Sequence, residues 1–175
     1  MKVLAFAASS SSKSINKKLA AYTLSLLDNA DGELLDINDY EMPLFSEDRE
    51  KELGKPQLAQ DFLNKIAASD ALIISFAEHN GSYSAAYKNL FDWCSRINPK
   101  VYQGKQMILL ATSPGTGGGS SVLAVATMSA PYFDGVVKAS ISMPKFYDNF
   151  DLETGKVTDS GMQQQLLSAV QELTP

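Results

Sequence analysis

The sequence predicts an α/β protein in which an open parallel sheet carries helices on both of its faces. Short, continuously apolar runs recur along the chain, and a helical spacing of apolar residues follows most of them. An unbroken apolar run is typical of a strand that is buried on both faces, as strands are in parallel sheets. Strands that alternate with helices form βαβ units, and these units place the helices on the two faces of one sheet.

Five strands and five helices are expected from these patterns. The strands are residues 3–7, 32–37, 71–76, 106–111 and 135–143, and Asp31 and Gly32 form the turn into the second strand. The helices are residues 15–26, 55–69, the segment from Tyr87 to Pro99, 122–133 and 160–173. Pro99 ends the third helix because it disfavours helical geometry at the residue before it. Residues 145–158 are expected to be irregular.

Length, charge and composition restrict the class of protein. A chain of 175 residues with 45% hydrophobic content is expected to form one globular domain, residues 1–175. The net charge of −5 argues against nonspecific binding to nucleic acid or to anionic membranes. Without an apolar stretch of roughly 18 residues, or the cleavage site of a signal peptide, we expect a cytoplasmic protein that does not enter a membrane.

Cysteine and histidine are too scarce for a disulfide or for a metal cluster. The chain has one cysteine, which excludes an internal disulfide, and one histidine, which argues against a zinc or copper cluster. Because Cys94 lies beside Trp93 in a helical pattern, we expect a buried and inert thiol. No metal site is predicted.

A serine-rich loop, residues 9–14, connects the first strand to the first helix. This arrangement brings backbone N–H groups and the positive end of a helix dipole to one point. Four consecutive serines add hydroxyl donors, so the loop suits a phosphate monoester. The alternative is that Ser14 caps the helix while the other serines fill the loop, although four serines exceed what capping requires.

Residues 77–82 form a second loop, at the carboxyl end of a central strand. Open α/β sheets bind ligands at this edge. Asn80 and Gly81 can adopt positive φ, which exposes successive backbone N–H groups without obstruction by side chains. The alternative is an ordinary turn between a strand and a helix.

A third loop, residues 112–120, is rich in glycine. Gly115-x-Gly117-x-x-Ser120 partly matches the fingerprint of dinucleotide-binding proteins, but its third glycine is absent. Asp134, at the distance expected for the acidic residue, precedes a strand instead of ending one. We therefore reject this interpretation, and the absence of a Gly-Lys-Ser/Thr triplet excludes a P-loop.

Together the three loops resemble those of a known family. Glu78-x-Asn80-Gly81-Ser82, followed by Lys88-Asn89-x-x-Asp92-Trp93, closely resembles the flavin loop and the next helix of the NADPH-dependent FMN reductases. Ser9, Ser14 and Asn16 match the phosphate loop of this family, and Ser113, Gly115, Gly118 and Gly119 match its glycine loop. Ala77 and His79 replace the family's Pro and Tyr, while Ala8 and Ser11 replace its Gly and Arg.

The resemblance implies a flavodoxin-like three-layer sandwich with strand order 2-1-3-4-5. The order changes direction between strands one and three, where the first two loops would meet. FMN would be the cofactor and would carry the chemistry, with NADPH or NADH as hydride donor and no certain catalytic residue. The cofactor-binding residues would be Ser9, Ser11, Ser14, Ile15 and Asn16 at the phosphate, Ala77, Glu78, His79, Asn80 and Gly81 at one edge of the ring, and Ser113, Gly115 and Gly118 at the other.

The expected function is that of an FMN-dependent NAD(P)H oxidoreductase that passes hydride to a quinone-like or other small acceptor. Lys13 or Lys17 would replace the missing arginine charge, or neutral donors alone would hold the phosphate. The alternatives are a flavodoxin-type electron carrier and a degenerate family member that binds flavin weakly. A homodimer or homotetramer is expected, because the resembled family forms dimers and because Met42, Leu44 and Phe45 are apolar residues within the acidic segment 38–54.

Overall fold

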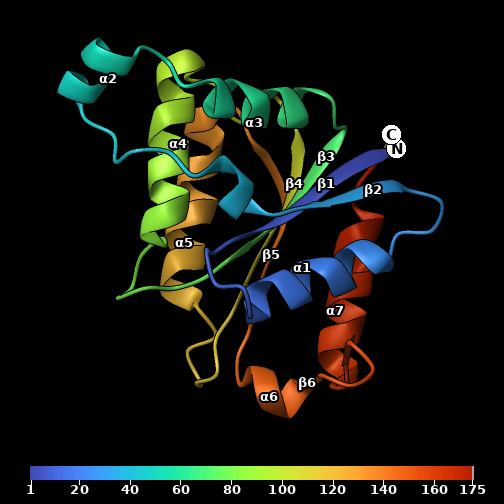
Figure 1. Ribbon diagram of the computed structural model, residues 1–175. Helices are drawn as coiled ribbons and strands as arrows, with labels where there is room; N and C mark the ends of the chain where they lie inside the picture. Colours follow the sequence, from blue (N-terminus) through green and yellow to red (C-terminus); the bar gives the residue numbers. More distant parts are fainter. Residues whose placement is uncertain (175) are drawn as a thin grey trace.

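The computed structural model describes residues 1–174, and its centre is a five-stranded parallel sheet (Figure 1). The strand order is β2-β1-β3-β4-β5, which confirms the predicted order. Register is regular across the centre, where Ile74 pairs with Phe6 on one side and with Leu109 on the other. The strands are β1 (Lys2–Ala8), β2 (Asp31–Leu35), β3 (Ala71–Phe76), β4 (Gln106–Thr112) and β5 (Val136–Met143).

Helices cover both faces of this sheet and give the predicted three layers. On one face lie α1 (Ile15–Ser25) and α7 (Ser160–Gln171). On the other lie α3 (Gln57–Ala67), α4 (Ala85–Ile97) and α5 (Ser120–Ser129). Alternate residues of β1 supply the two cores, since Leu4 and Phe6 face one layer and Val3 and Ala5 the other. Full burial of a side chain as large as Val3, Leu4 or Phe6 stabilises the fold by about 1.5–3 kcal/mol.

The start and the end of β2 differ from the prediction. Asp31 and Gly32 belong to the strand, and Asp31 N–H donates to the Met1 carbonyl at 3.0 Å. A Cβ on Gly32 would lie 3.0 Å from Leu24 of α1, so glycine at this position permits close packing of the helix on the strand. At the other end the strand stops at Leu35, and Ile37–Tyr40 form the 3₁₀-helix η1.

The acidic segment that follows contains more structure than predicted, including the helix α2 (Glu47–Leu53). Met42 is 8% exposed, and Phe45 packs edge-on against Trp93 with ring centroids 5.1 Å apart. Met42 and Phe45 therefore pack within the chain itself, and of the three apolar residues from which a dimer was expected, Leu44 alone stays exposed, at 77%.

Two residues of the Lys88-Asn89-x-x-Asp92-Trp93 signature hold this segment in place. The Asn89 side chain accepts a hydrogen bond from Phe45 N–H at 2.8 Å and donates to the Met42 carbonyl at 3.0 Å. Trp93 Nε1 donates to the Pro43 carbonyl at 2.7 Å. These contacts give the signature a structural role on α4. Beside Trp93, Cys94 is buried, and burial raises the pKa of its thiol to about 12, as expected for an inert cysteine.

The C-terminal third refines two further predictions. Helix α5 begins at Ser120, two residues before the predicted start, and the 3₁₀-helix η2 (Ala130–Phe133) follows it. Residues 145–158 are ordered into a short helix, α6 (Phe146–Asn149), and a hairpin of β6 (Phe150–Asp151) and β7 (Lys156–Val157). The segment folds because Phe146, Phe150 and Val157 are buried in the core between the sheet and α1 and α7. No helix among residues 1–174 is long and apolar enough to cross a membrane.

Candidate functional site

Three loops leave the carboxyl ends of β1, β3 and β4, and long-range hydrogen bonds hold them together. Ser84 Oγ, at the start of α4, donates to the Ala8 carbonyl at the end of β1 at 2.9 Å. The Asn16 side chain of α1 binds both backbone groups of Thr112 at the end of β4. Since β1 and β3 are neighbours whose connections run in opposite directions, the loops meet at the predicted switch point of the sheet.

The serine loop is shaped by its own side chains. Ser9 Oγ accepts from Ser11 N–H at 3.2 Å, and Ser11 Oγ accepts from Lys13 N–H at 3.3 Å. Ser14 Oγ accepts from Lys17 N–H at 3.1 Å and so caps α1, as the simpler interpretation of this residue predicted. In each case the hydroxyl oxygen accepts while its own hydrogen stays free to donate to a ligand.

Backbone donors at the start of α1 add to these hydroxyls. Within the described chain, the N–H groups of Ser12, Ile15 and Asn16 have no hydrogen-bond acceptor. They lie at the positive end of the helix dipole, where an anion is stabilised. Sequence analysis counted Ser12 among the four consecutive serines but not among the phosphate ligands, because no sequence pattern reports which backbone N–H groups are left without an acceptor.

The two lysines proposed as substitutes for arginine have different surroundings. The Lys17 ammonium pairs with the Asp36 carboxylate, and this hydrogen bond lowers the pKa of that carboxyl below its usual value. Lys13 is exposed and has no carboxylate within ion-pair distance among residues 1–174. Of the two, Lys13 is the cation that can still approach a phosphate.

The Asn80–Gly81 turn has the positive φ angles that were predicted, 52° and 78°. Positive φ at both central residues is characteristic of a type I′ turn, and His79 and Ser82 exchange two backbone hydrogen bonds across it at 2.9 and 3.1 Å. The N–H groups of Asn80 and Gly81 have no acceptor in the part of the chain that the structure describes. His79 and the two turn residues are exposed, so these donors face outward.

Beside this turn, the Glu78 side chain is directed at its own chain. Its Oε2 accepts a hydrogen bond from Val122 N–H, in the first turn of α5, at 3.0 Å. A carboxylate is favourable at the positive end of a helix dipole. Glu78 thus ties the second loop to α5 through one carboxylate oxygen, and its backbone remains available to a ligand. The neighbouring Ala77 is 8% exposed.

The glycine loop packs closely against its own chain. A Cβ on Gly118 would lie 2.4 Å from Ser142 Oγ and one on Gly119 would lie 2.9 Å from the Ala111 Cβ. Glycine at positions 118 and 119 therefore permits this loop to pack closely against β4 and the end of β5. A Cβ on Gly115 would meet no atom within 4 Å, and Ser113 Oγ bonds inside the loop to the Gly115 carbonyl at 3.3 Å.

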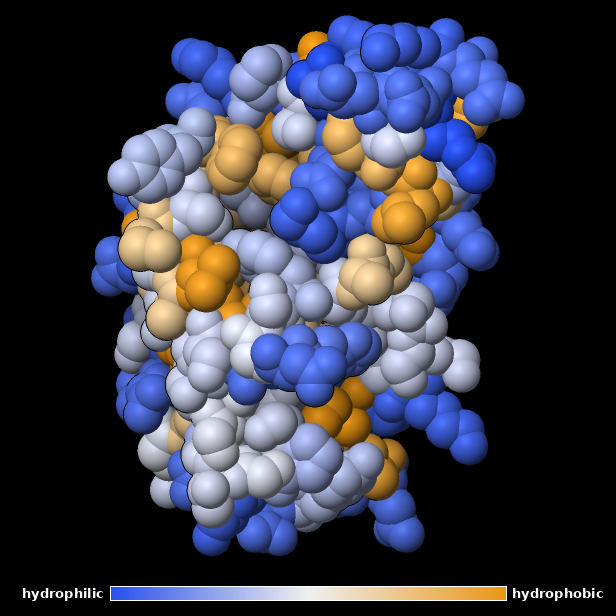
Figure 2. All heavy atoms as spheres, turned by 90° about the vertical axis from the view of Figure 1, so that its left-hand side faces the viewer, coloured by the Kyte–Doolittle hydropathy of each residue, from blue (hydrophilic) through white to orange (hydrophobic). Residues whose placement is uncertain are grey.

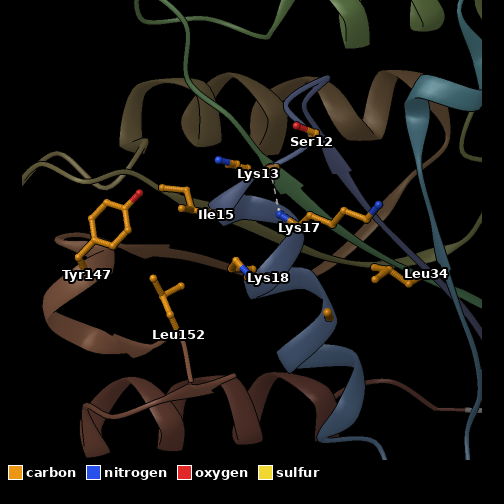
Figure 3. Close-up of a pocket in the computed structure, with 10 residues that line it drawn as sticks. Ser12, Lys13, Ile15, Lys17, Lys18, Leu34, Tyr147 and Leu152 are labelled. Atoms are coloured by element: carbon orange, nitrogen blue, oxygen red, sulfur yellow. Dashed lines mark hydrogen bonds between the residues drawn. The ribbon is translucent and has the colours of Figure 1, made fainter. Parts of the chain in front are cut away.

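A cavity of about 580 Å³ lies on the outer side of the serine loop (Figure 3). Tyr147 and Leu152 face Ile15 there, and Lys17 and Lys18 of α1 also line the cavity. None of the residues that line it belongs to the second or third loop. Sequence analysis missed Tyr147 and Leu152 because both lie in the segment that was predicted to be irregular.

A flavodoxin-like sheet with anion-suited donors at its switch point defines a class of nucleotide- and flavin-binding proteins. Comparison with known proteins is more specific. The sequence profile of the NADPH-dependent FMN reductases matches residues 1–147. The chain belongs to this family of NAD(P)H-dependent oxidoreductases, in which FMN is the cofactor and NAD(P)H the electron donor.

Individual proteins similar to this chain are also reductases by name. A quinone reductase of Escherichia coli is 27% identical over 126 residues, which are 69% of this chain and 65% of the relative. An NADPH:quinone oxidoreductase of Arabidopsis thaliana is 36% identical over 89 residues, 51% and 44% of the two chains. Each match thus spans less than two thirds of the relative. The structure of FerB, a flavoenzyme NAD(P)H:(acceptor) oxidoreductase of Paracoccus denitrificans, superimposes with a TM-score of 0.75 at 26% identity and covers 97% of this chain and 93% of FerB.

The donors present fit FMN. A phosphate monoester is a dianion with three acceptor oxygens. The serine loop offers several hydroxyl groups. The N–H groups of Ser12, Ile15 and Asn16, at or just before the start of α1, have no acceptor among residues 1–174, and together these donors suit such an anion. The outward N–H groups of Asn80 and Gly81 suit the carbonyl and nitrogen acceptors of a flavin ring.

Proposed function

We propose that this chain is an FMN-dependent NAD(P)H oxidoreductase that passes hydride to a quinone-like or other small acceptor. One observation carries the proposal: two neighbouring loops, tethered at the switch point, both present backbone N–H groups that have no acceptor in residues 1–174. One group of donors suits a phosphate and the other suits a ring edge. FMN carries both features in one molecule.

At the phosphate end, the proposed ligands are hydroxyl and N–H donors. Ser9, Ser11 and Ser14 contribute O–H groups, and Ile15 and Asn16 contribute the first N–H groups of α1. A dianion that accepts from several such donors is held by charge-assisted hydrogen bonds. In place of the family's arginine, we assign the compensating positive charge to Lys13.

At the ring end, residues Ala77 to Gly81 border one edge and Ser113 to Gly118 the other. The N–H groups of Asn80 and Gly81 stabilise negative charge at the polar edge when the ring is reduced. His79 contacts the ring without acting as an acid or base. Bound FMN supplies the hydride chemistry, and the protein orients the ring and leaves one face accessible.

A flavodoxin-type electron carrier is the alternative from another class. Such a carrier binds FMN but does not serve a small-molecule acceptor. The names of the E. coli and Arabidopsis relatives support the reductase, since both refer to quinone reduction. A degenerate member that binds flavin weakly is the second alternative, because Ala8 and Ser11 stand where the family has Gly and Arg.

Two measurements test the proposal. Titration of the apo protein with FMN should quench flavin fluorescence and saturate near one equivalent per chain. Oxidation of NADPH in the presence of a quinone should then proceed catalytically. Absence of saturable quenching would contradict FMN binding, whereas binding without NADPH oxidation would support the electron carrier.

We also propose a homodimer that forms through the α4–α5 face, shown in Figure 2, where hydrophobic side chains lie among polar ones. Met128 is 69% exposed and Tyr132 is 83% exposed, and Val125 lies beside them on the same stretch. A cavity of about 200 Å³ between the two helices is lined by aromatic side chains including Tyr83, Phe91 and Phe133. Light scattering should return twice the chain mass of 19.0 kDa, and Met128→Asp should return the single mass. A wild-type particle of 19.0 kDa would overturn this proposal.

A further inference from the structure

The Asn16 side chain is almost completely buried, at 3% exposure, and it makes three hydrogen bonds. Its Nδ2 donates to the Thr112 carbonyl at 3.1 Å, and its Oδ1 accepts from Thr112 N–H at 3.0 Å. The same Oδ1 accepts from Ser75 Oγ at 2.8 Å. Ser75 and Thr112 are 0% and 2% exposed, so the cluster is closed to solvent.

Its position in the fold joins the two ends of the proposed site. Asn16 is the second residue of α1, and its backbone N–H is one of the donors assigned to the phosphate. Thr112 is the last residue of β4, and the loop assigned to one edge of the ring begins at Ser113. Because the amide binds both the N–H and the C=O of Thr112, it fixes the orientation of that backbone as well as its distance.

We propose that Asn16 is a positioning residue whose side chain sets the spacing between the phosphate loop and the glycine loop. The inference rests on the proposed function, and it assigns the side chain of Asn16 a role that the expected phosphate contact does not include. The side chain does not touch FMN. It acts through Thr112, and its backbone N–H remains a phosphate donor.

Few side chains other than asparagine can bind both backbone groups of Thr112. This requires one donor and one acceptor at a fixed separation, and a leucine of similar size would leave both Thr112 groups buried without partners. An ionised aspartate would place a negative oxygen against the Thr112 carbonyl. A protonated aspartic acid, in contrast, can donate to that carbonyl and still accept from the N–H.

The test compares the affinities of apo protein for FMN and for riboflavin, which has the ring but lacks the phosphate. Only FMN engages both ends of the site, so the ratio of the two dissociation constants reports how well the ends are spaced. In Asn16→Asp at pH 8 we expect this preference for FMN to fall about tenfold or more, as for a broken buried hydrogen bond. Burial raises the pKa of the introduced carboxyl, so the preference should return as the pH is lowered through that pKa.

Three controls accompany the variant. The wild type is measured at each pH, because the phosphate of FMN itself changes charge in this range. The second pKa of a phosphate monoester is about 6. Asn64→Asp adds the same charge at an exposed position of α3. Ser75→Ala leaves both Thr112 contacts in place, so its preference should stay within about threefold of the wild type.

Asn16→Ser is the second test variant, in case Asn16→Asp does not fold at pH 8. Its side chain is neutral at every pH and too short to bind both Thr112 groups, so the preference for FMN should fall again. Wild-type preference in a folded Asn16 variant, or an equal loss of FMN and riboflavin affinity, would show that Asn16 only supports the fold. A wild type that binds neither flavin would instead refute the proposed function itself.

Discussion

The serine loop and the Asn80–Gly81 turn leave neighbouring strands, but different interactions give them their shapes. In the serine loop, three hydroxyl oxygens accept hydrogen bonds from N–H groups two or three residues further along the chain. In the turn, the shape comes from two residues with positive φ and from a pair of backbone hydrogen bonds. The two regions therefore respond differently to substitution.

This difference separates side-chain recognition from backbone recognition. Removing a hydroxyl from the serine loop removes both a loop-shaping acceptor and a ligand donor. Removing a side chain from the turn leaves its donors in place, because they are backbone N–H groups. Only a change of backbone geometry disturbs them. A variant of one loop that changes FMN binding in the way expected of the other loop would contradict this difference.

The largest effect is expected for Ser14→Ala. Loss of its hydroxyl should weaken FMN binding by about 1–3 kcal/mol, with little change in the flavin midpoint potential, since the phosphate lies far from the reacting ring. The apo protein should lose about 1 kcal/mol of stability because α1 loses its cap. Titration measures the affinity, spectroelectrochemistry the potential, and chemical denaturation the stability.

Asp159→Ala is the matched control, because Asp159 caps α7 by accepting from Met162 N–H at 2.7 Å. It should lower the free energy of unfolding to a similar extent and leave FMN affinity unchanged. If the two variants bind FMN equally well, Ser14 is only a helix cap.

Gly81→Ala should have a smaller effect on affinity but an additional effect on the redox potential. An alanine at φ 78° is strained by about 1 kcal/mol or more, and relief of that strain turns the N–H donors of the turn. FMN binding should weaken, and the midpoint potential should become more negative because the reduced form loses stabilisation. The apo fold should survive.

Gly155 provides the control for this variant. It has φ 69° in the β6–β7 hairpin, and a Cβ there, as at Gly81, would meet no atom within 4 Å. Gly155→Ala should cost similar stability and change neither affinity nor potential. Unchanged FMN properties in Gly81→Ala would reduce the second loop to an ordinary turn.

Much of the fold could be predicted because apolar runs and helical spacing depend on local sequence. Strand order and the meeting of the loops followed from the resemblance together with the general topology of α/β sheets. Positive φ at Asn80 and Gly81 was predictable because few other residue types adopt it readily. The cap formed by Ser14 was equally local.

The missed features depend on contacts between distant parts of the chain. Nothing near Asn16 in sequence announces Thr112 or Ser75, and nothing near Glu78 announces Val122. Packing likewise shapes the acidic segment, where Asn89 and Trp93 bind the backbone of Phe45 and Pro43 through hydrogen bonds that the local sequence does not specify. Such partners become visible only when the fold places them side by side.

Glu78→Gln should have a modest effect on stability and a small effect on FMN affinity, because this side chain ties the turn to α5 but does not determine the conformation of the turn. The amide oxygen can still accept from Val122 N–H, but the favourable charge at the start of α5 is lost. We expect the free energy of unfolding to fall by about 0.3–1 kcal/mol. FMN affinity should change less than in Gly81→Ala. A larger loss of affinity in thermal-shift and titration experiments would mean that the turn depends on this anchor.

The smallest effect is expected for Lys13→Gln, which tests whether charge supplements the hydroxyls of the serine loop. Lys13 is exposed, so its attraction to a phosphate is weakened by solvent and should contribute only about 0.2–1 kcal/mol to FMN affinity. Because ions screen exposed charges over a Debye length of about 10 Å at 0.1 M salt, the difference from the wild type should be largest at low salt and disappear near 1 M.

Riboflavin, which has no phosphate, should bind both proteins equally. Lys100→Gln removes the same charge elsewhere and should bind FMN like the wild type. If Lys13→Gln does so too at low salt, neutral donors alone hold the phosphate, and the loop differs from the turn only in where its donors come from.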